Sequence, residues 1–202
     1  MKHKYIIKDV GLINYSTTLK EMQYFTSSRS SETHDELWIV EHYPVFSQGR
    51  HGKPEHIISN HKDIPIIQSD RGGQVTYHGP GQAIIYFMMD LKKLGIGIKD
   101  LVCKIEKTTI KLLKLYNIEA HLIEGAPGVY VSNKKIASLG LRVKHGKTYH
   151  GLSINVDMDL TPFSYINPCG YKNLEICQIS DFIPNISMYK IHKQYISLFT
   201  GS

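Results

Sequence analysis

The sequence predicts an α+β protein with a mostly antiparallel, mixed sheet that is flanked by helices. Strand-like runs outnumber helical ones, and neighbouring strands follow one another as hairpins instead of alternating regularly with helices. The 202 residues contain no low-complexity segment and no long linker. We therefore expect one domain that covers residues 1–202 and buries a sizeable core.

Seven runs have the alternation or the short apolar character of strands. They are Tyr5–Lys8, Glu36–His42, Ile64–Gln68, Gln82–Met89, Gly128–Val131, Lys135–Val143 and Tyr149–Val156. Ser132-Asn133-Lys134 is typical of a hairpin turn between two of these runs.

Three segments have helical patterns. Thr17–Ser28 follows a Ser/Thr capping position, and Lys99–Tyr116 carries apolar residues at helical spacing with lysines on the other face. Ser187–Phe199 is a shorter candidate helix. The three helices are expected to cover the sheet.

Composition and charge limit the function classes. Hydrophobic content of 42% and charged content of 21% are ordinary for a soluble globular protein, and no stretch is long enough to span a membrane. The charged N-terminal residues lack an apolar signal core, so we expect a cytoplasmic protein. A net charge of +6 favours an acidic partner, either nucleic acid or an acidic carrier protein, although an idle basic surface remains an equally good interpretation.

The chain has three cysteines, Cys103, Cys169 and Cys177, with no CxxC spacing. The odd number indicates a reducing compartment and no disulfide framework. The eleven histidines show no matching Cys/His spacing, so we expect no metal site.

Cys169 is the candidate nucleophile. It stands between Pro168 and Gly170, on a turn that leaves its side chain free to face a cleft. Thiolates attack acyl carbons well and leave well from thioesters. An incidental loop cysteine is the alternative, whereas Cys103 and Cys177 have the contexts of ordinary packing or surface cysteines.

Lys135 is the candidate partner of that thiol. Alternation along the strand places Lys135 on one face and Lys134 on the other. Its face continues with Ala137, Leu139, Leu141 and Val143, so the ammonium is expected to be at least partly desolvated. A lysine that reaches past the strand edge to water is the alternative.

The segment from Arg71 to Gln82 has four glycines and directly precedes an apolar run. Glycine amides bind phosphate or an oxyanion, and glycine also lets an extended ligand approach the backbone; a plain turn is the alternative. The spacing matches neither a P-loop nor GxGxxG. Thr76-Tyr77-His78-Gly79 recurs as Thr148-Tyr149-His150-Gly151, which suggests that two strands present a His-Gly corner to one cavity.

These motifs together resemble the lipoyl(octanoyl) transferase family. The resemblance rests on Arg71–Gln82, Gly128–Val131 with Lys135–Val143, Tyr149–Val156 and Asn167–Tyr171, and Pro44–Arg50 fits the same pattern. It covers roughly residues 5 to 182, and nothing is carried over beyond Ile183.

The resemblance implies the fold of the biotin/lipoate transferase and ligase superfamily. It also implies transfer of an octanoyl (or lipoyl) group from acyl carrier protein to a lysine of a lipoyl domain, in protein lipoylation and lipoate biosynthesis. The acceptors would be lipoyl domains of 2-oxoacid dehydrogenases and the glycine cleavage H protein. No cofactor is expected because a thioester donor is already activated.

The same resemblance assigns the site residues. Cys169 matches the nucleophile that carries the acyl thioester, and Lys135 matches the lysine that favours its thiolate. The positions that match substrate contacts are Arg71, Gly72, Gly73, Gln74, Val75, Thr76, Tyr77, His78, Ser138, Leu139, Gly140, Gly151, Leu152 and Ser153. Glycine amides at 72–73 or 140 are candidates for an oxyanion hole.

Three other functions stay open at this stage. An ATP-dependent lipoate or biotin ligase of the same superfamily would need a nucleotide site but no cysteine. A papain-like hydrolase would pair Cys169 with His150 and use water as acceptor. A basic module without catalytic activity would bind nucleic acid through its tyrosines, but the chain has no recognisable nucleic-acid-binding motif.

Overall fold

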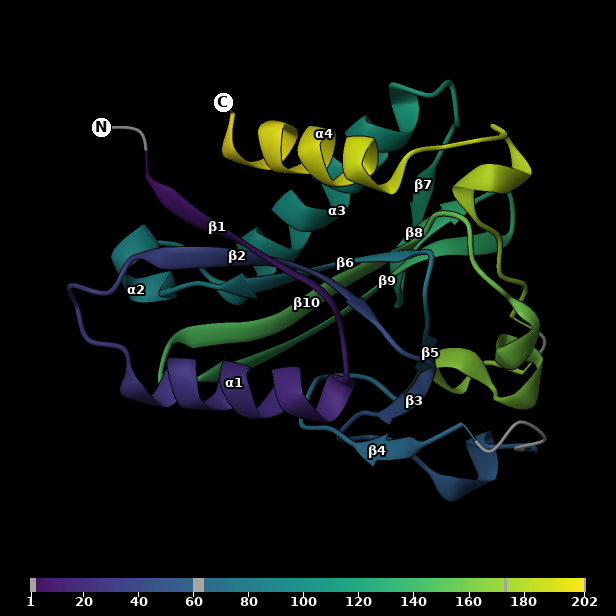
Figure 1. Cartoon of the computed structure of the whole chain (residues 1–202), viewed down its shortest axis with the longest axis horizontal. Coiled ribbons are helices and arrows are strands. Elements are labelled where there is room, and N and C mark those ends of the chain that lie inside the picture. The colour runs from purple at the N-terminus through teal and green to yellow at the C-terminus, as the bar shows by residue number, and fades with distance from the viewer. Residues whose placement is uncertain (1–2, 60–63, 173, 202) are drawn as a thin grey trace.

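The computed structural model describes residues 3–59, 64–172 and 174–201. A seven-stranded sheet with the order β1-β2-β6-β10-β9-β8-β7 forms its centre, and a three-stranded sheet with the order β4-β3-β5 lies beside it (Figure 1). The strands are β1 (Tyr5–Ile13), β2 (Asp35–His42), β3 (Val45–Gln48), β4 (Ile66–Gln68), β5 (Val75–His78), β6 (Gln82–Met88), β7 (His121–Ile123), β8 (Ala126–Val131), β9 (Lys134–Lys144) and β10 (Lys147–Asn155).

The helices are α1 (Tyr15–Ser28), α2 (Leu91–Leu94), α3 (Ile98–Lys114) and α4 (Met188–Thr200). Four short 3₁₀ turns lie in the connections: η1 (Pro54–His56), η2 (Thr161–Tyr165), η3 (Pro168–Gly170) and η4 (Ile179–Asp181). Within the described residues, no helix has the length and apolar character that crossing a bilayer requires.

The hairpin β9–β10 lies near the centre of the large sheet. A two-residue turn joins these strands, and both of its residues have left-handed backbone, His145 at φ 51° and Gly146 at φ 81°. Two left-handed residues are the signature of a turn whose twist matches that of the strands. The register then pairs Gly151 with Gly140 and Ser153 with Ser138, so the predicted site positions of the two strands lie side by side.

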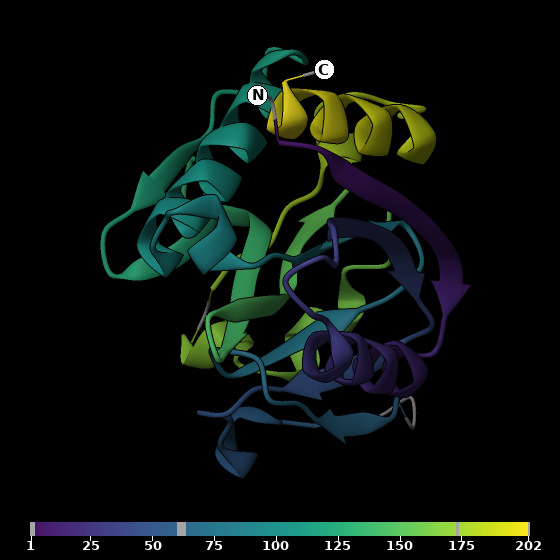
Figure 2. The ribbon, with the colours of Figure 1, turned by 90° about the vertical axis from the view of Figure 1, so that its left-hand side faces the viewer.

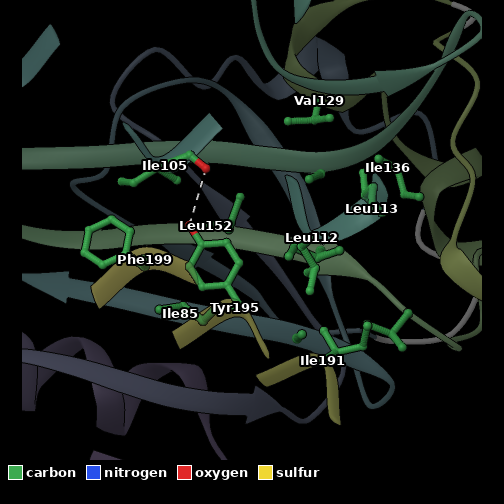
Figure 3. Close-up of a cluster of buried hydrophobic side chains, with 14 of the residues drawn as sticks. Ile85, Ile105, Leu112, Leu113, Val129, Ile136, Leu152, Ile191, Tyr195 and Phe199 are labelled. Carbon is green, nitrogen blue, oxygen red and sulfur yellow. Dashed lines mark hydrogen bonds between the residues drawn. The ribbon is translucent and has the colours of Figure 1, made fainter. Parts of the chain in front are cut away.

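Helices α3 and α4 cover one face of the large sheet (Figure 2). Leu112 and Ile105 of α3 pack with Tyr195 of α4 against Ile85 and other buried residues of the sheet (Figure 3). The helical spacing of the apolar residues, with polar residues on the outer face, produces this one-sided burial. The other face of the sheet is therefore left for α1 and for the small sheet.

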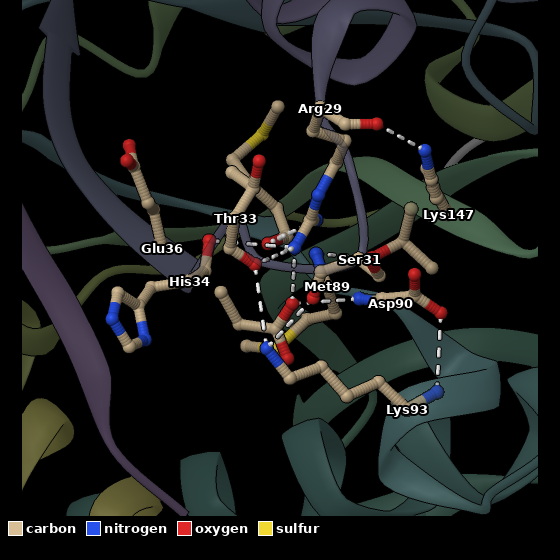
Figure 4. Close-up of polar contacts among 12 residues, drawn as sticks. Arg29, Ser31, Thr33, His34, Glu36, Met89, Asp90, Lys93 and Lys147 are labelled. Atoms are coloured by element: carbon tan, nitrogen blue, oxygen red, sulfur yellow. Dashed lines mark hydrogen bonds and ion pairs between the residues drawn. The ribbon is translucent and has the colours of Figure 1, made fainter.

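Arg29, directly after α1, anchors that helix to the sheet. Its guanidinium donates a hydrogen bond to the Met88 carbonyl (2.9 Å) and pairs with the buried carboxylate of Asp35. Lys147 Nζ donates to the Arg29 carbonyl at 2.6 Å (Figure 4). A buried ion pair with further hydrogen bonds is costly to break, because it would leave an uncompensated charge. These contacts hold α1 against β2, β6 and β10.

The predicted fold class is confirmed, and several details differ. β1 pairs with β2, and β3 with β4, in parallel, whereas the other strand pairs are antiparallel. The run predicted at Tyr5–Lys8 extends to Ile13, and the strand predicted at Ile64–Gln68 begins only at Ile66. The short elements β3, β5, β7 and α2 were not predicted, because three or four residues carry too little periodicity.

Candidate active site

Two cavities meet at Cys169. The inner pocket, of about 480 Å³, lies between the large sheet, α1 and β5, and the outer cleft, of about 1070 Å³, lies along β9 and α3. Five residues line both cavities: Gly73, Gln74, Leu139, Gly140 and Cys169. A thiol at this junction faces a pocket lined mostly by buried residues on one side and a cleft lined mostly by partly exposed residues on the other.

The turn that carries Cys169 has an unusual backbone. Cys169 lies in η3 with φ 56°, and Gly170 follows at φ 81°. A left-handed conformation is uncommon for residues other than glycine and costs free energy, so the surroundings must enforce it. One tether is Asn167, whose N–H donates to the His56 carbonyl at 2.8 Å. The Pro-Cys-Gly sequence therefore forms a held turn, and Cys169 is half-buried on it.

Lys135 contacts this thiol from β9. Its side chain is 1% exposed, and Nζ donates hydrogen bonds to Cys169 Sγ (3.4 Å) and to the Pro127 carbonyl (3.0 Å). Burial by itself would lower the pKa of Lys135, but attraction to the Cys169 thiolate, and next to the Tyr130 hydroxyl, outweighs burial and raises that pKa. The amine is consequently an ammonium that stabilises negative charge on sulfur.

Lys134 shows that strand alternation separates the two lysines. Its ammonium is half exposed and lies 3.5 Å from the Glu175 carboxylate, outside both cavities. The predicted desolvation of Lys135 is confirmed and is nearly complete. The alternative required the Lys135 side chain to reach past the strand edge to water, and it does not.

Arg71 organises the glycine-rich segment. Its buried guanidinium donates to the carbonyls of Ser47 (2.6 Å) and Gln74 (2.6 Å), and to that of Gly72 (2.9 Å). The N–H of Gly72 donates to the Leu141 carbonyl at 3.1 Å, so the expectation that this amide belongs to an oxyanion hole is wrong. The backbone around residues 71–74 is held rigidly beside β9.

Alternation in β5 divides the predicted contacts of this segment. Thr76 and His78 line the inner pocket, whereas Val75 and Tyr77 belong to a separate buried cluster with Phe46 and Phe163. The rings of Tyr77 and Phe163 meet edge to face at 5.5 Å. Val75 and Tyr77 thus pack behind the wall that Thr76 and His78 present to the pocket.

His78 and His150 both line the inner pocket, as the repeated Thr-Tyr-His-Gly motif predicts. His78 bonds to Gln82 Oε1 (2.7 Å) and Ser47 Oγ (3.1 Å), and His150 Nε2 bonds to Asp70 Oδ1 (2.8 Å). Burial lowers the pKa of each imidazole, so both rings are neutral near pH 7. For His150, the effect of burial outweighs that of Asp70, which raises the pKa. The two rings therefore present polar but uncharged groups to the pocket.

The remaining predicted positions also lie at the site. Ser138, Leu139 and Gly140 of β9 and Gly151, Leu152 and Ser153 of β10 line the inner pocket, together with Arg71, Gly73 and Gln74, while Gly72 lines the outer cleft. Three pocket residues were not predicted: Tyr15 of α1, and Ile84 and Tyr86 of β6. No motif surrounds them, and only the fold brings them to the pocket.

No group of metal-ligating side chains occurs in the described part of the chain. The thiol's hydrogen-bonding partner is Lys135, whereas His150 is bound to Asp70. A Cys169–His150 pair of the papain type therefore does not match this arrangement.

Comparison with known proteins gives a consistent result. The sequence profile of the lipoyl protein ligase A/B catalytic domain matches residues 14–200. An octanoyltransferase of Francisella tularensis is 56% identical over 193 residues, which are 95% of this chain and 93% of that protein. An octanoyltransferase of Legionella pneumophila is 51% identical over 194 residues, which are 96% and 97% of the two chains.

Solved structures share the fold at low sequence identity. A crystal structure of lipoate-protein ligase A bound with ATP superposes with a TM-score of 0.81 at 15% identity, covering 100% of this chain and 85% of that one. Biotin protein ligase from Aquifex aeolicus in complex with biotin and ATP gives 0.60 at 11% identity, covering 98% and 69%. These likenesses confirm the predicted superfamily fold.

Proposed function

The chain belongs to the lipoyl protein ligase A/B catalytic domain family, and we propose that it is an octanoyltransferase that acts through an acyl thioester on Cys169. The observation that carries the proposal is the 3.4 Å contact between Lys135 Nζ and Cys169 Sγ where the two cavities meet. Relatives that are 51–56% identical over nearly the whole chain carry the octanoyltransferase name, which favours a transferase over a ligase.

In the first half-reaction the Cys169 thiolate attacks the carbonyl carbon of a carrier-bound octanoyl thioester. The new carbon–sulfur bond forms, the bond to the carrier sulfur breaks, and the departing thiolate takes a proton from the Lys135 ammonium. The products are an acyl-enzyme, a free carrier thiol and a neutral Lys135 amine. The inner pocket then encloses the octanoyl chain.

In the second half-reaction a lysine amine of the acceptor enters through the outer cleft. Its nitrogen attacks the acyl carbon, its proton passes to the neutral Lys135 amine, and Cys169 leaves as thiolate. The ammonium–thiolate pair is restored, so each cycle begins with the same charges. A preactivated thioester requires neither ATP nor a metal for this sequence.

The proposal extends to partners and location. The donor is an octanoylated acyl carrier protein, and the acceptors are lipoyl domains of 2-oxoacid dehydrogenases and the glycine cleavage H protein. Acidic domains of this kind suit a chain with a net charge of +6. The free thiols of Cys103, Cys169 and Cys177 suit a reducing compartment, and we propose the cytoplasm.

Intact-mass analysis after mixing with octanoyl-acyl carrier protein tests the proposal. Without ATP, the protein should gain one octanoyl group that hydroxylamine removes, and a lipoyl domain should then discharge it. Cys169→Ala should abolish the adduct, and Cys103→Ser should retain it. Product formation that requires ATP, or an adduct that persists in Cys169→Ala, would contradict the proposed mechanism.

A further inference from the structure

The side chain of Gln74 lies where the two cavities meet, next to the thiol. Its backbone is fixed from two sides, because its carbonyl accepts hydrogen bonds from Arg71 Nη2 (2.6 Å) and from the N–H of Gly49 (3.2 Å). A residue whose backbone is held in this way can present its carboxamide at a defined place.

The carboxamide of Gln74 rests on the turn that carries Cys169. A Cβ atom added at Gly170 would lie 2.2 Å from Gln74 Nε2, 2.5 Å from Cδ and 2.6 Å from Oε1. The glycine after the nucleophile therefore has two functions: it adopts φ 81°, and it leaves the space that the amide of Gln74 occupies. This amide is within one residue of the atom that would carry the acyl group.

The oxygen of that amide is buried without a hydrogen-bond donor among the described residues. The nearby ammonium of Lys135 directs its hydrogen bonds to Cys169 Sγ and the Pro127 carbonyl instead. A buried acceptor without a donor costs free energy, and such groups in native proteins call for an explanation. At a catalytic junction, the missing donor is naturally a substrate group.

We infer that Gln74 is a catalytic residue of the second half-reaction, in which its Oε1 accepts a hydrogen bond from the attacking amine of the acceptor lysine. The inference rests on the proposed function, since it requires an acyl-enzyme on Cys169. It assigns a role in addition to the proton transfer to Lys135: a second acceptor that orients the nucleophile before its proton is lost.

The chemistry of aminolysis explains the need for such an acceptor. As the carbon–nitrogen bond forms, the electron pair of the carbonyl moves to oxygen and the nitrogen becomes positively charged. One N–H then gives its proton to Lys135, while a second N–H donates to Gln74 Oε1. Hydrogen bonds to charged donors are stronger than neutral ones, so this contact gains strength in the transition state and accelerates the step.

The competing donor is the amide N–H of the carrier's pantetheine arm, which would contact Gln74 in the first half-reaction. That nitrogen is separated from the carrier sulfur by carbon atoms of the arm, so it is farther from the acyl carbon than the sulfur is. The attacking amine must instead approach the acyl carbon on Cys169 Sγ to about 3–3.5 Å. The packing of Gln74 against the Cys169–Gly170 turn favours the amine.

Two substitutions separate these roles. Gln74→Met keeps the length of the side chain and removes the carboxamide, whereas Gln74→Glu keeps an oxygen acceptor. Gln68→Met is the matched control, because the Gln68 carboxamide donates to the carbonyls of Gln48, Gly49 and Ser69 outside both cavities. Melting temperatures of the variants verify folding.

The half-reactions are then timed separately. Acyl-enzyme formation is followed by intact mass with octanoyl-acyl carrier protein alone, and discharge is followed after a lipoyl domain is added to the isolated acyl-enzyme. For Gln74→Met we expect acylation within about threefold of wild type and discharge slowed roughly 10- to 100-fold, through kcat and not KM. Gln74→Glu should discharge faster than Gln74→Met, and Gln68→Met should match wild type.

Other outcomes overturn the inference. Equal slowing of both steps would make Gln74 a structural wall, slowing of acylation alone would assign it to the carrier arm, and unchanged discharge would remove it from the chemistry. Failure of the wild-type protein to acylate at all would overturn the proposed function and this inference with it, whereas the outcomes above overturn the inference alone.

Discussion

Gly128→Ala is expected to disturb the catalytic pair although it substitutes neither Cys169 nor Lys135. Gly128, in β8, has φ 127°, a backbone region that L-residues rarely adopt. A Cβ there would lie 2.6 Å from the Ala137 carbonyl oxygen, 3.0 Å from Lys135 Cε and 3.4 Å from Nζ. The contact with the Ala137 carbonyl is relieved only by a shift of the backbone, which costs stability, whereas the contact with Lys135 is relieved when its flexible side chain moves away.

The size of the effect follows from these distances. Moving Lys135 Cε to an ordinary contact displaces Nζ by roughly 0.5–1 Å. The attraction between Nζ and Cys169 Sγ at 3.4 Å is about 5 kcal/mol for an effective dielectric constant of about 20, and it falls by roughly 1 kcal/mol when the separation grows by about 1 Å. Loss of that much stabilisation slows acylation roughly fivefold to tenfold. Backbone strain and crowding together lower the free energy of unfolding by roughly 2–5 kcal/mol.

The assay measures single-turnover acylation by octanoyl-acyl carrier protein, together with urea unfolding of the same preparation. Gly95→Ala is the control, because Gly95 also has left-handed backbone (φ 65°) but has no atom within 4 Å of an added Cβ. It should lose about 1 kcal/mol of stability and acylate at the wild-type rate. A folded Gly128→Ala protein that acylates as fast as wild type would refute the argument that Lys135 must be held in place.

Three further predictions concern charge. Lys135→Ala should slow alkylation of Cys169 at pH 7 at least roughly tenfold, because Nζ no longer stabilises negative charge on Sγ, whereas Lys134→Ala should change the rate little. Equal alkylation rates for wild type and Lys135→Ala would remove the ion pair from the mechanism. Burial lowers the pKa of His42 from 6.5 to about 4, so between these pH values the unfolded state binds a proton that the folded state does not. The free energy of unfolding should therefore fall by roughly 3 kcal/mol as the pH drops from about 6.5 to 4. Urea unfolding of His42→Gln should show a smaller fall over the same pH range. His78 and His150 act in the same direction, whereas the lowered pKa of Asp70 takes effect only below this window. Finally, kcat/KM for octanoyl-acyl carrier protein should drop steeply between low salt and roughly 0.3 M salt, because salt screens the attraction between opposite charges. The value of kcat/KM for octanoyl-coenzyme A should drop less steeply. If kcat/KM for the carrier protein does not change with salt, the net charge of +6 does not steer partners.

The sequence pattern was sufficient to predict those features of the structure that are decided by residues close together in the chain. Ser132-Asn133-Lys134 predicted the turn between β8 and β9, and apolar residues three to four positions apart predicted the buried stripe of α3, because side-chain direction follows backbone periodicity. The same rule placed Lys135 and Lys134 on opposite sides, and the Pro-Cys-Gly triplet marked Cys169 as a residue on a turn with its side chain free to face a cleft. These features depend on a few consecutive residues and on backbone geometry alone.

Only the tertiary structure decided which distant residues meet. The contact between Lys135 and Cys169 spans 34 positions, and Tyr15 and Tyr86 reach the inner pocket from α1 and β6 without any motif around them. Strand β5 turns Val75 and Tyr77 away from the pocket because it pairs with β3 in a small sheet whose short strands carry no readable pattern. That Gln74 Oε1 is buried without a donor among the described residues could not be predicted from the sequence either. Whether a polar atom has a hydrogen-bond partner depends on all the residues packed around it and not on its neighbours in sequence.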